Sequence, residues 1–104
     1  MKIRHLITMA AVLSVPTAAF AAGDGETLFK KSNCGACHAP DKKSVGPSIK
    51  DIAAKYNGDK GAQSKLEVKV RSGGAGAFGS MPMPATSKAV SDAEIKTMVS
   101  WILG

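Results

Sequence analysis

Two cysteines and a histidine form the clearest chemical motif in this chain. Cys34-Gly35-Ala36-Cys37-His38 has the C-x-x-C-H pattern, which is the signature of haem attachment. Two thiols separated by two residues can each add to one vinyl group of the same porphyrin and form thioethers. The histidine that follows can then supply an axial nitrogen to the iron. The pattern predicts one covalently attached haem c, bound through Cys34 and Cys37, with His38 as an iron ligand.

Thiol redox chemistry, a zinc site and a disulfide suit the cysteine pair less well. A thioredoxin-like redox pair is expected beside a βαβ pattern, and the sequence shows none. A structural zinc site takes four ligands, whereas this chain holds two cysteines and two histidines, one of which, His5, belongs to an N-terminal leader. A disulfide between the two thiols would close a very short loop, and short loops contribute least to stability.

The sixth ligand of the iron decides between electron transfer and ligand chemistry. No histidine follows His38, so the choices are a methionine thioether or an open position. Met98 falls on the apolar stripe of an expected helix and fits better as core filling. Met81 and Met83 lie in an irregular Gly/Pro-rich segment. We favour Met83, because the prolines on either side of it lower the entropy lost on ligation, and we keep Met81 as the alternative.

Residues 1–21 predict a signal peptide. A basic start precedes an apolar run over residues 6–15, and Ala19-Phe20-Ala21 has the small-x-small pattern of a cleavage site. This run is far shorter than the roughly 20 residues that a membrane-spanning helix needs. Cleavage after Ala21 would release a single basic domain, residues 22–104, into the periplasm, with no membrane span.

Helical periodicity and capping signals predict four short helices and no sheet. The first covers about 25–32 with Asp24 as its cap, and the second runs from the cap Ser48 to about Tyr56. A capping box of Ser64 and Glu67 predicts a third helix near 65–72.

The last helix has the strongest signals. Ser91 and Glu94 form another capping box, and the apolar stripe that follows consists of Ile95, Met98, Val99 and Ile102. Before this helix, residues 73–87 predict one long loop without secondary structure of its own. Loops of that kind are usually functional.

Beyond the motif itself, the chain from residue 24 to residue 103 resembles the short bacterial class I cytochromes c of the five-fifty-one type. The resemblance is carried by Leu28-Phe29, the haem motif with Ala39, Val45-Gly46-Pro47, the run from Asp51 to Tyr56, Pro82-Met83-Pro84, Val90-Ser91-Asp92 and Trp101. It implies an all-α fold of about four short helices wrapped around one covalently bound haem. It also implies that Phe29 packs near the stripe of the last helix.

The resemblance further implies that His38 and Met83 are the axial ligands of the iron. The carbonyl of Pro47 is then expected to accept a hydrogen bond from the other ring nitrogen of His38, which would fix the ring and raise its basicity.

Two positions depart from the family's pattern. Phe78 stands where relatives often carry a tryptophan that donates to a haem propionate. Lys69 or a backbone amide is the candidate donor in its place. Thr86 stands where an asparagine often supports the ligating sulfur. Both departures bear on the reduction potential rather than on the fold.

These features together predict a single-electron carrier rather than an enzyme. A His/Met pair favours the ferrous state, and the chain shows no acid–base pair for peroxide chemistry. We expect a monomer that shuttles electrons from a quinol-oxidising complex to a terminal oxidase or a nitrite-reductase-type acceptor. Four lysines after the haem motif could steer it to acidic partner surfaces: Lys42, Lys43, Lys50 and Lys55. Nucleic acid is a poor match for an exported chain with few aromatic residues. Two hypotheses compete with this one: a haem protein with an open sixth position, and a haem subunit dedicated to a single enzyme.

Overall fold

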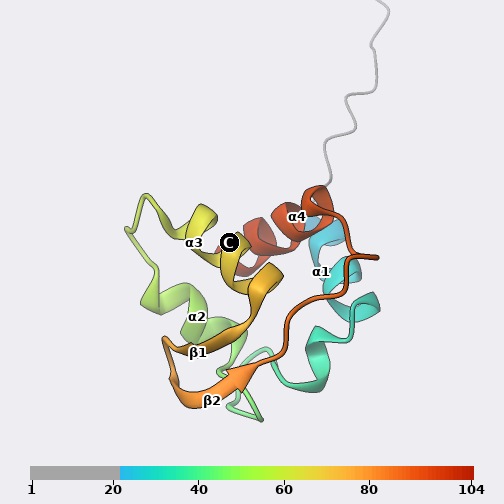
Figure 1. Cartoon of the computed structure of the whole chain (residues 1–104). Coiled ribbons are helices and arrows are strands. Elements are labelled where there is room, and N and C mark those ends of the chain that lie inside the picture. Colours follow the sequence, from blue (N-terminus) through green and yellow to red (C-terminus); the bar gives the residue numbers. More distant parts are fainter. Residues whose placement is uncertain (1–21) are drawn as a thin grey trace, which may run out of the picture.

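The computed structural model describes residues 22–104, and the leader predicted at 1–21 lies outside the described residues. The described chain folds into four α-helices, one 3-10 turn and one β-hairpin (Figure 1). Their order is α1 (Ala22–Lys31), η1 (Cys34–Ala36), α2 (Ile49–Lys55), α3 (Ala62–Ser72), β1 (Gly74–Gly76), β2 (Gly79–Met83) and α4 (Asp92–Leu103). In this part of the chain, no helix is both long enough and apolar enough to span a bilayer.

Helix α4 is the centre of the packing, and it begins as its sequence predicts. The Oγ of Ser91 accepts from the N–H of Glu94, and the Glu94 carboxylate accepts from the N–H of Ser91. The N–H of Ser91, which donates to the carboxylate, is the main cause of a lowered pKa of Glu94, and the nearby Ser91 hydroxyl adds to it. The capping box is therefore confirmed. The four residues of the predicted apolar stripe are all buried, with Val99 fully inaccessible to solvent.

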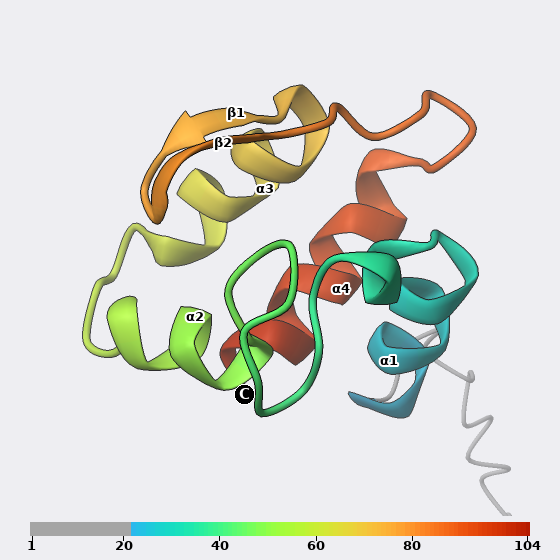
Figure 2. The ribbon, with the colours of Figure 1, turned by 90° about the horizontal axis from the view of Figure 1, so that it is seen from below.

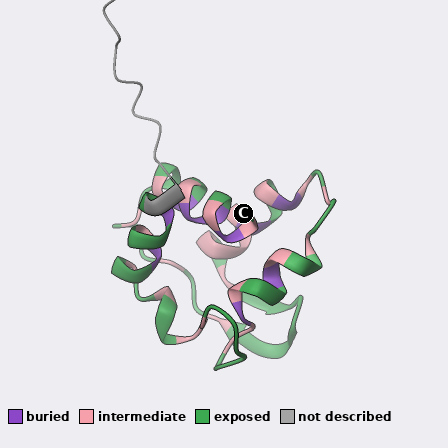
Figure 3. Ribbon diagram, turned by 180° about the vertical axis from the view of Figure 1, so that it is seen from behind, coloured by how far each residue is buried: buried purple, intermediate pink, exposed green. Residues whose placement is uncertain are grey.

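Helices α1, α2 and α3 all contact α4, with α1 on one side and α2 and α3 on the other (Figure 2). The ring centroids of Phe29 in α1 and Trp101 in α4 lie 5.2 Å apart. Phe29 also belongs to the same buried cluster as Ile95 and Val99, as expected from the resemblance. The buried faces of the helices turn toward one another (Figure 3). The buried cluster consists of Phe29, Ile52, Leu66, Ile95, Met98, Val99 and Ile102. Each such side chain contributes about 1.5–3 kcal/mol when it leaves water.

The second helix is confirmed and the first starts earlier than predicted. Ser48 caps α2, because its Oγ accepts from the N–H of Asp51 at 3.0 Å. Asp24 does not cap α1, since that helix already begins at Ala22. Asp24 instead lies in its first turn, where the helix dipole favours an anion.

The capping box predicted for the third helix is wrong. Helix α3 begins at Ala62, and its N-cap is Gly61, which makes no side-chain cap. Ser64 therefore lies inside the helix. The chain enters α3 through a turn in which Asp59 accepts from the N–H of Gly61 at 2.8 Å and from Lys65 at 2.8 Å. This turn around Asp59, rather than the Ser64–Glu67 pair, marks the start of α3.

The prediction of an unstructured loop over 73–87 is also wrong in its first half. Strands β1 and β2 pair antiparallel there, with Gly74 opposite Met83 and Gly76 opposite Gly79. Gly76 and Gly79 both have positive φ, which lets the chain reverse around the two residues between them. Residues 74–83 lack the alternation of apolar and polar residues that predicts a strand. A mostly exposed hairpin has no buried face that would require this alternation. The fold remains predominantly helical.

Candidate functional site

The cysteine motif lies on a tight turn that follows α1. Asn33 adopts a left-handed conformation with φ 62°, which ends the helix and redirects the chain. The carbonyl of Cys34 then accepts from the N–H groups of Cys37 at 3.2 Å and His38 at 3.1 Å. The motif is thus wound into one compact turn.

A hydrogen bond fixes one ring nitrogen of His38. Its Nδ1 lies 2.8 Å from the carbonyl oxygen of Pro47, and because a carbonyl only accepts, Nδ1 donates. This bond leaves the lone pair of a neutral imidazole on Nε2, the nitrogen that a metal could use. The turn that holds Pro47 is itself tied back, since the N–H of Gly46 donates to the carbonyl of Cys37 at 2.8 Å.

The His38 ring also rests directly on Gly46. A Cβ at that position would lie 2.6 Å from the ring Cε1 and 2.9 Å from Nδ1. The resemblance implied the hydrogen bond to Pro47, but the sequence analysis did not predict this close approach of Gly46. Glycine directly before the hydrogen-bonding proline was the available signal.

All helices and the hairpin border one cavity of about 750 Å³. This volume is in the range of pockets that bind drug-sized ligands and cofactors. Its lining is mainly apolar, and it includes Cys34 and His38 from the motif, Ile52 and Tyr56 from α2 and its end, Leu66, Lys69 and Val70 from α3, Phe78, Met81 and Met83 from the hairpin, and Met98 and Ile102 from α4. The fold therefore brings the motif and the methionines to the same space, although they lie far apart in sequence.

The three methionines differ in their surroundings. Met98 is 1% exposed and belongs to the core, as predicted, while one part of it reaches the cavity wall. Met81 and Met83 both line the cavity from β2, but Met81 is 68% exposed whereas Met83 is half-buried. A half-buried thioether has already lost hydration and conformational freedom on folding, so it loses less of both when it binds iron, and this difference favours Met83 as the ligand.

The two cysteines are placed differently. Both thiols are free and half-buried, but Cys34 lines the cavity and Cys37 does not. Burial raises the pKa of the Cys34 thiol. A redox-active dithiol depends on a lowered thiol pKa, so this environment disfavours thiol–disulfide exchange.

The residues at the family's two departures also have defined partners. Phe78 lies at the hairpin turn, where Lys55 Nζ is 5.1 Å from its ring centroid. Lys69 lines the same cavity from α3. The hydroxyl of Thr86 donates to the carbonyl of Val70 at 2.6 Å, so its single proton is not directed at a methionine sulfur.

The donor set fits a haem c. The cavity is apolar, and a histidine with its second nitrogen already paired faces it together with a methionine thioether and a thiol. These are the groups that hold such a haem in a low-dielectric site. When bound, the haem would supply a one-electron redox centre.

Comparison with known proteins identifies the family. The family model described as Cytochrome c matches residues 22–104. The chain belongs to the cytochrome c family. It is 48% identical over 82 residues to cytochrome c-551 of Pseudomonas aeruginosa, covering 79% of this chain and 77% of that protein. It is 44% identical over 103 residues to cytochrome c-552 of Nitrosomonas europaea, covering 99% of this chain and 97% of that one.

A solved structure has the same fold. The crystal structure of wild-type Nitrosomonas europaea cytochrome c552 superposes with a TM-score of 0.71 at 46% identity, covering 75% of this chain and 95% of that one. The resemblance to short class I cytochromes c is thus confirmed. The cofactor is one covalently attached haem c, and the chain is an electron-transfer protein rather than an enzyme.

Proposed function

We propose that the chain is a periplasmic single-electron carrier whose haem iron is ligated by His38 and Met83. The observation that carries the proposal is the hydrogen bond from His38 Nδ1 to Pro47, which presents Nε2 at a cavity that Met83 also lines. A histidine and a methionine that remain bound in both oxidation states leave little to rearrange when one electron moves. The protein contributes orientation, burial and exclusion of water.

The proposal that the protein is exported depends on its N-terminal segment. The segment 1–21 has the charge, apolar run and cleavage pattern of a signal peptide, and the family match begins at residue 22, directly after the proposed cut. The similarity to the Nitrosomonas europaea relative extends over 99% of this chain and so includes most of the leader. We propose that residues 22–104 are the mature monomer.

The ligand pair is tested by visible spectra of the mature haem-loaded protein. The wild type is expected to be low-spin and to show the weak far-red sulfur-to-iron band in its oxidised form. Met83→Ala should lose that band, whereas Met81→Ala, a matched change on the same strand, should keep it, because Met81 is mostly exposed. A high-spin wild type would overturn the proposal. A band that survives in Met83→Ala but disappears in Met81→Ala would transfer the ligand assignment to Met81.

The proposed partners are a quinol-oxidising complex as donor and a terminal oxidase or nitrite-reductase-type protein as acceptor. Support comes from four exposed lysines, which are Lys42, Lys43, Lys50 and Lys55. Lys43 lines the cavity, and Lys55 lies over the ring of Phe78 at its border. Positive charge at this border would attract acidic docking surfaces close to the point of electron exit.

Salt and charge reversal test this steering. With membranes of the host as electron donor, the second-order rate of reduction should fall as ionic strength rises. Replacing Lys42 and Lys43 by Glu should lower it about tenfold at low salt. Replacing Lys60 and Lys96 by Glu, two exposed lysines that do not line the cavity, is the charge-matched control and should change this rate much less. If the control variant lowered the rate as much as the Lys42/Lys43 variant, or if the rate did not depend on salt, the proposal that these lysines steer docking would be contradicted.

A further inference from the structure

The chain between Met83 and α4 has no helix or strand of its own. Residues 84–91 form an irregular segment that leads from the end of β2 to the capping box of α4. Such a segment has few internal hydrogen bonds, so contacts from elsewhere must hold it. If it moved away from the molecule, the C-terminal side of Met83 would lose its anchor. What fixes this segment therefore bears directly on Met83.

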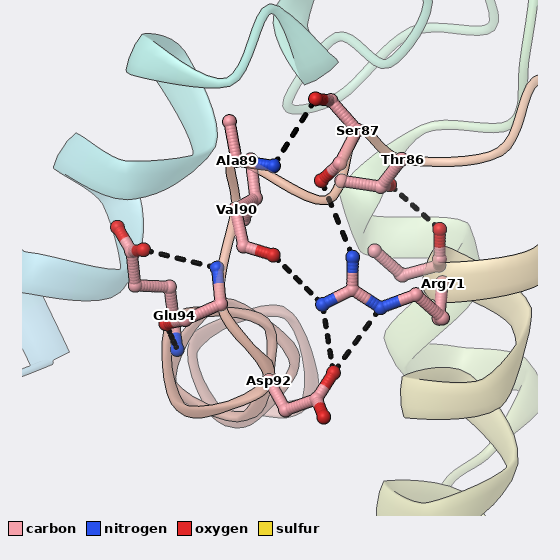
Figure 4. A network of polar contacts seen from close by, with 9 residues as sticks. Arg71, Thr86, Ser87, Ala89, Val90, Asp92 and Glu94 are labelled. Carbon is pink, nitrogen blue, oxygen red and sulfur yellow. Dashed lines mark hydrogen bonds and ion pairs between the residues drawn. The ribbon is translucent and has the colours of Figure 1, made fainter.

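One guanidinium from α3 holds the segment at several points (Figure 4). Arg71 donates to the carbonyl of Ser87 through Nη1 at 3.2 Å and to the carbonyl of Val90 through Nη2 at 2.7 Å. It also donates to the Oδ1 of Asp92 through Nη2 at 2.7 Å and Nε at 3.1 Å. Four of the five N–H donors of this side chain are thereby used on a stretch of six residues.

The two carbonyl contacts matter more than the ion pair. The Arg71 side chain is 29% exposed, whereas that of Asp92 is 93% exposed, and an exposed ion pair contributes little. Hydrogen bonds from a charged donor to backbone carbonyls are stronger than neutral ones, and Ser87 and Val90 belong to the segment itself. The rigid planar fork reaches both carbonyls at once, which the single ammonium of a lysine cannot do.

Neighbouring residues of α3 support the same segment closer to Met83. The N–H and hydroxyl of Thr86 both donate to the carbonyl of Val70, at 3.3 and 2.6 Å. Directly after α3, the Cα of Gly73 lies against the backbone of Met83 and Pro84, where a Cβ would overlap the carbonyl oxygen of Met83. The end of α3 thus contacts the chain from Met83 to the start of α4 along its length.

We propose that Arg71 is a positioning residue that latches residues 84–91 to α3 and so limits how often Met83 leaves the iron. Release of the latch would let the segment swing out with Met83 and admit an external ligand to the sixth position. The inference rests on the proposed ligation by Met83 and adds the element that controls it. Arg71 does not line the cavity, and its hydrogen bonds go to Ser87, Val90 and Asp92 rather than to His38 or Met83.

The test uses imidazole as an external ligand of the oxidised, haem-loaded protein. At high imidazole concentration the binding rate saturates at the rate at which Met83 dissociates, which the loss of the far-red band reports. Arg71→Met should raise this limiting rate about tenfold or more, because it removes both carbonyl contacts. Arg71→Lys should recover only part of the wild-type behaviour, and Asp92→Asn should change the rate less than twofold. All variants should keep the far-red band before imidazole is added.

Gln63→Ala is the matched control. Gln63 also joins α3 to α4, since its Nε2 donates to the carbonyl of Lys96 and its Oε1 accepts from Ser100, but it does not touch the segment. It should leave the limiting rate near that of the wild type even where thermal stability falls. Should Arg71→Met fail to fold, Arg71→Lys against Gln63→Ala gives the same comparison.

Two outcomes overturn the inference. Either the Arg71 variants bind imidazole at the wild-type limiting rate, or Gln63→Ala accelerates binding as much as they do, which would show only general loosening. A wild type without the far-red band would instead refute ligation by Met83. The failure of the latch and the failure of the ligand assignment are therefore separate results.

Discussion

Gly46→Ala is expected to displace the ring of His38 and to lower the yield of correctly matured protein severalfold. The new Cβ would lie 2.6 Å from the ring Cε1 and 3.3 Å from the carbonyl of Cys37, so either the ring or the turn must move. If the ring turns away, the bond from Nδ1 to Pro47 at 2.8 Å is lost. We expect a loss of about 1–3 kcal/mol in the free energy of unfolding.

Haem content after periplasmic expression and chemical denaturation of the purified protein measure this effect. Gly35→Ala is the matched control, because it adds the same methyl group within the motif but meets only the ring of Phe29, at 3.9 Å. It should mature and unfold almost as the wild type does. If both alanine variants behave alike, the packing of His38 on Gly46 does not constrain the site.

Gly73→Ala is expected to disturb the opposite side of the cavity. Gly73 has φ 68°, a conformation that favours glycine, and a Cβ there would also approach the backbone of Pro84 and Ala85 to 2.8 Å. Since these neighbours are backbone atoms, they cannot rotate away as a flexible side chain can. We expect a loss of about 3 kcal/mol or more, together with a weakened far-red band because Met83 is pushed from its place.

Gly58→Ala separates the cost of a positive φ from the cost of the clash with neighbouring backbone atoms. Gly58 has φ 79° and open space around its Cβ direction, so alanine there adds only the conformational cost, about 1 kcal/mol, and should leave the far-red band unchanged. Thermal unfolding followed with the oxidised spectrum checks both variants. A Gly73→Ala protein that is no less stable than Gly58→Ala and keeps its far-red band would show that the hairpin accommodates the added methyl group without displacing Met83.

Gly46 and Gly73 have comparable positions at the site. Gly46 lies against the histidine that the motif contributes, and Gly73 lies against the strand end that bears Met83. In each case the absence of a Cβ lets one backbone segment approach the group that is proposed to bind iron. Precise placement of ligands by closely packed backbone is a common requirement of preorganised sites.

Several parts of the structure could be predicted from local sequence alone. The C-x-x-C-H motif identified the cofactor, and the Ser91–Glu94 box with its apolar stripe predicted α4 and its buried face, because caps and periodicity act within a few residues. The prediction of Ser48 as the N-cap of α2 was correct for the same reason. The Ser64–Glu67 pattern failed although its spacing is equally suitable, since the turn around Asp59 starts α3 earlier.

The hairpin shows the limit of local reasoning most clearly. Glycines permit many conformations, so the run from Gly73 to Gly79 excludes regular helix without selecting what replaces it. The pairing of β1 with β2 follows no alternation of apolar residues in this run, and the approach of Met83 to Gly73 is seen only in the folded chain. Sequence reasoning therefore predicted a functional loop there but not its strands.

By itself, the sequence determined the haem motif, the family, the helical character and the short list of candidate ligands, because these follow from residue types at close spacing. Only the tertiary structure decided which methionine is sheltered, which hydroxyl is already paired and which arginine holds the segment after Met83. Those properties depend on atoms brought together from distant positions, such as Arg71 and Val90. Their contact energies exist only after folding has placed them side by side.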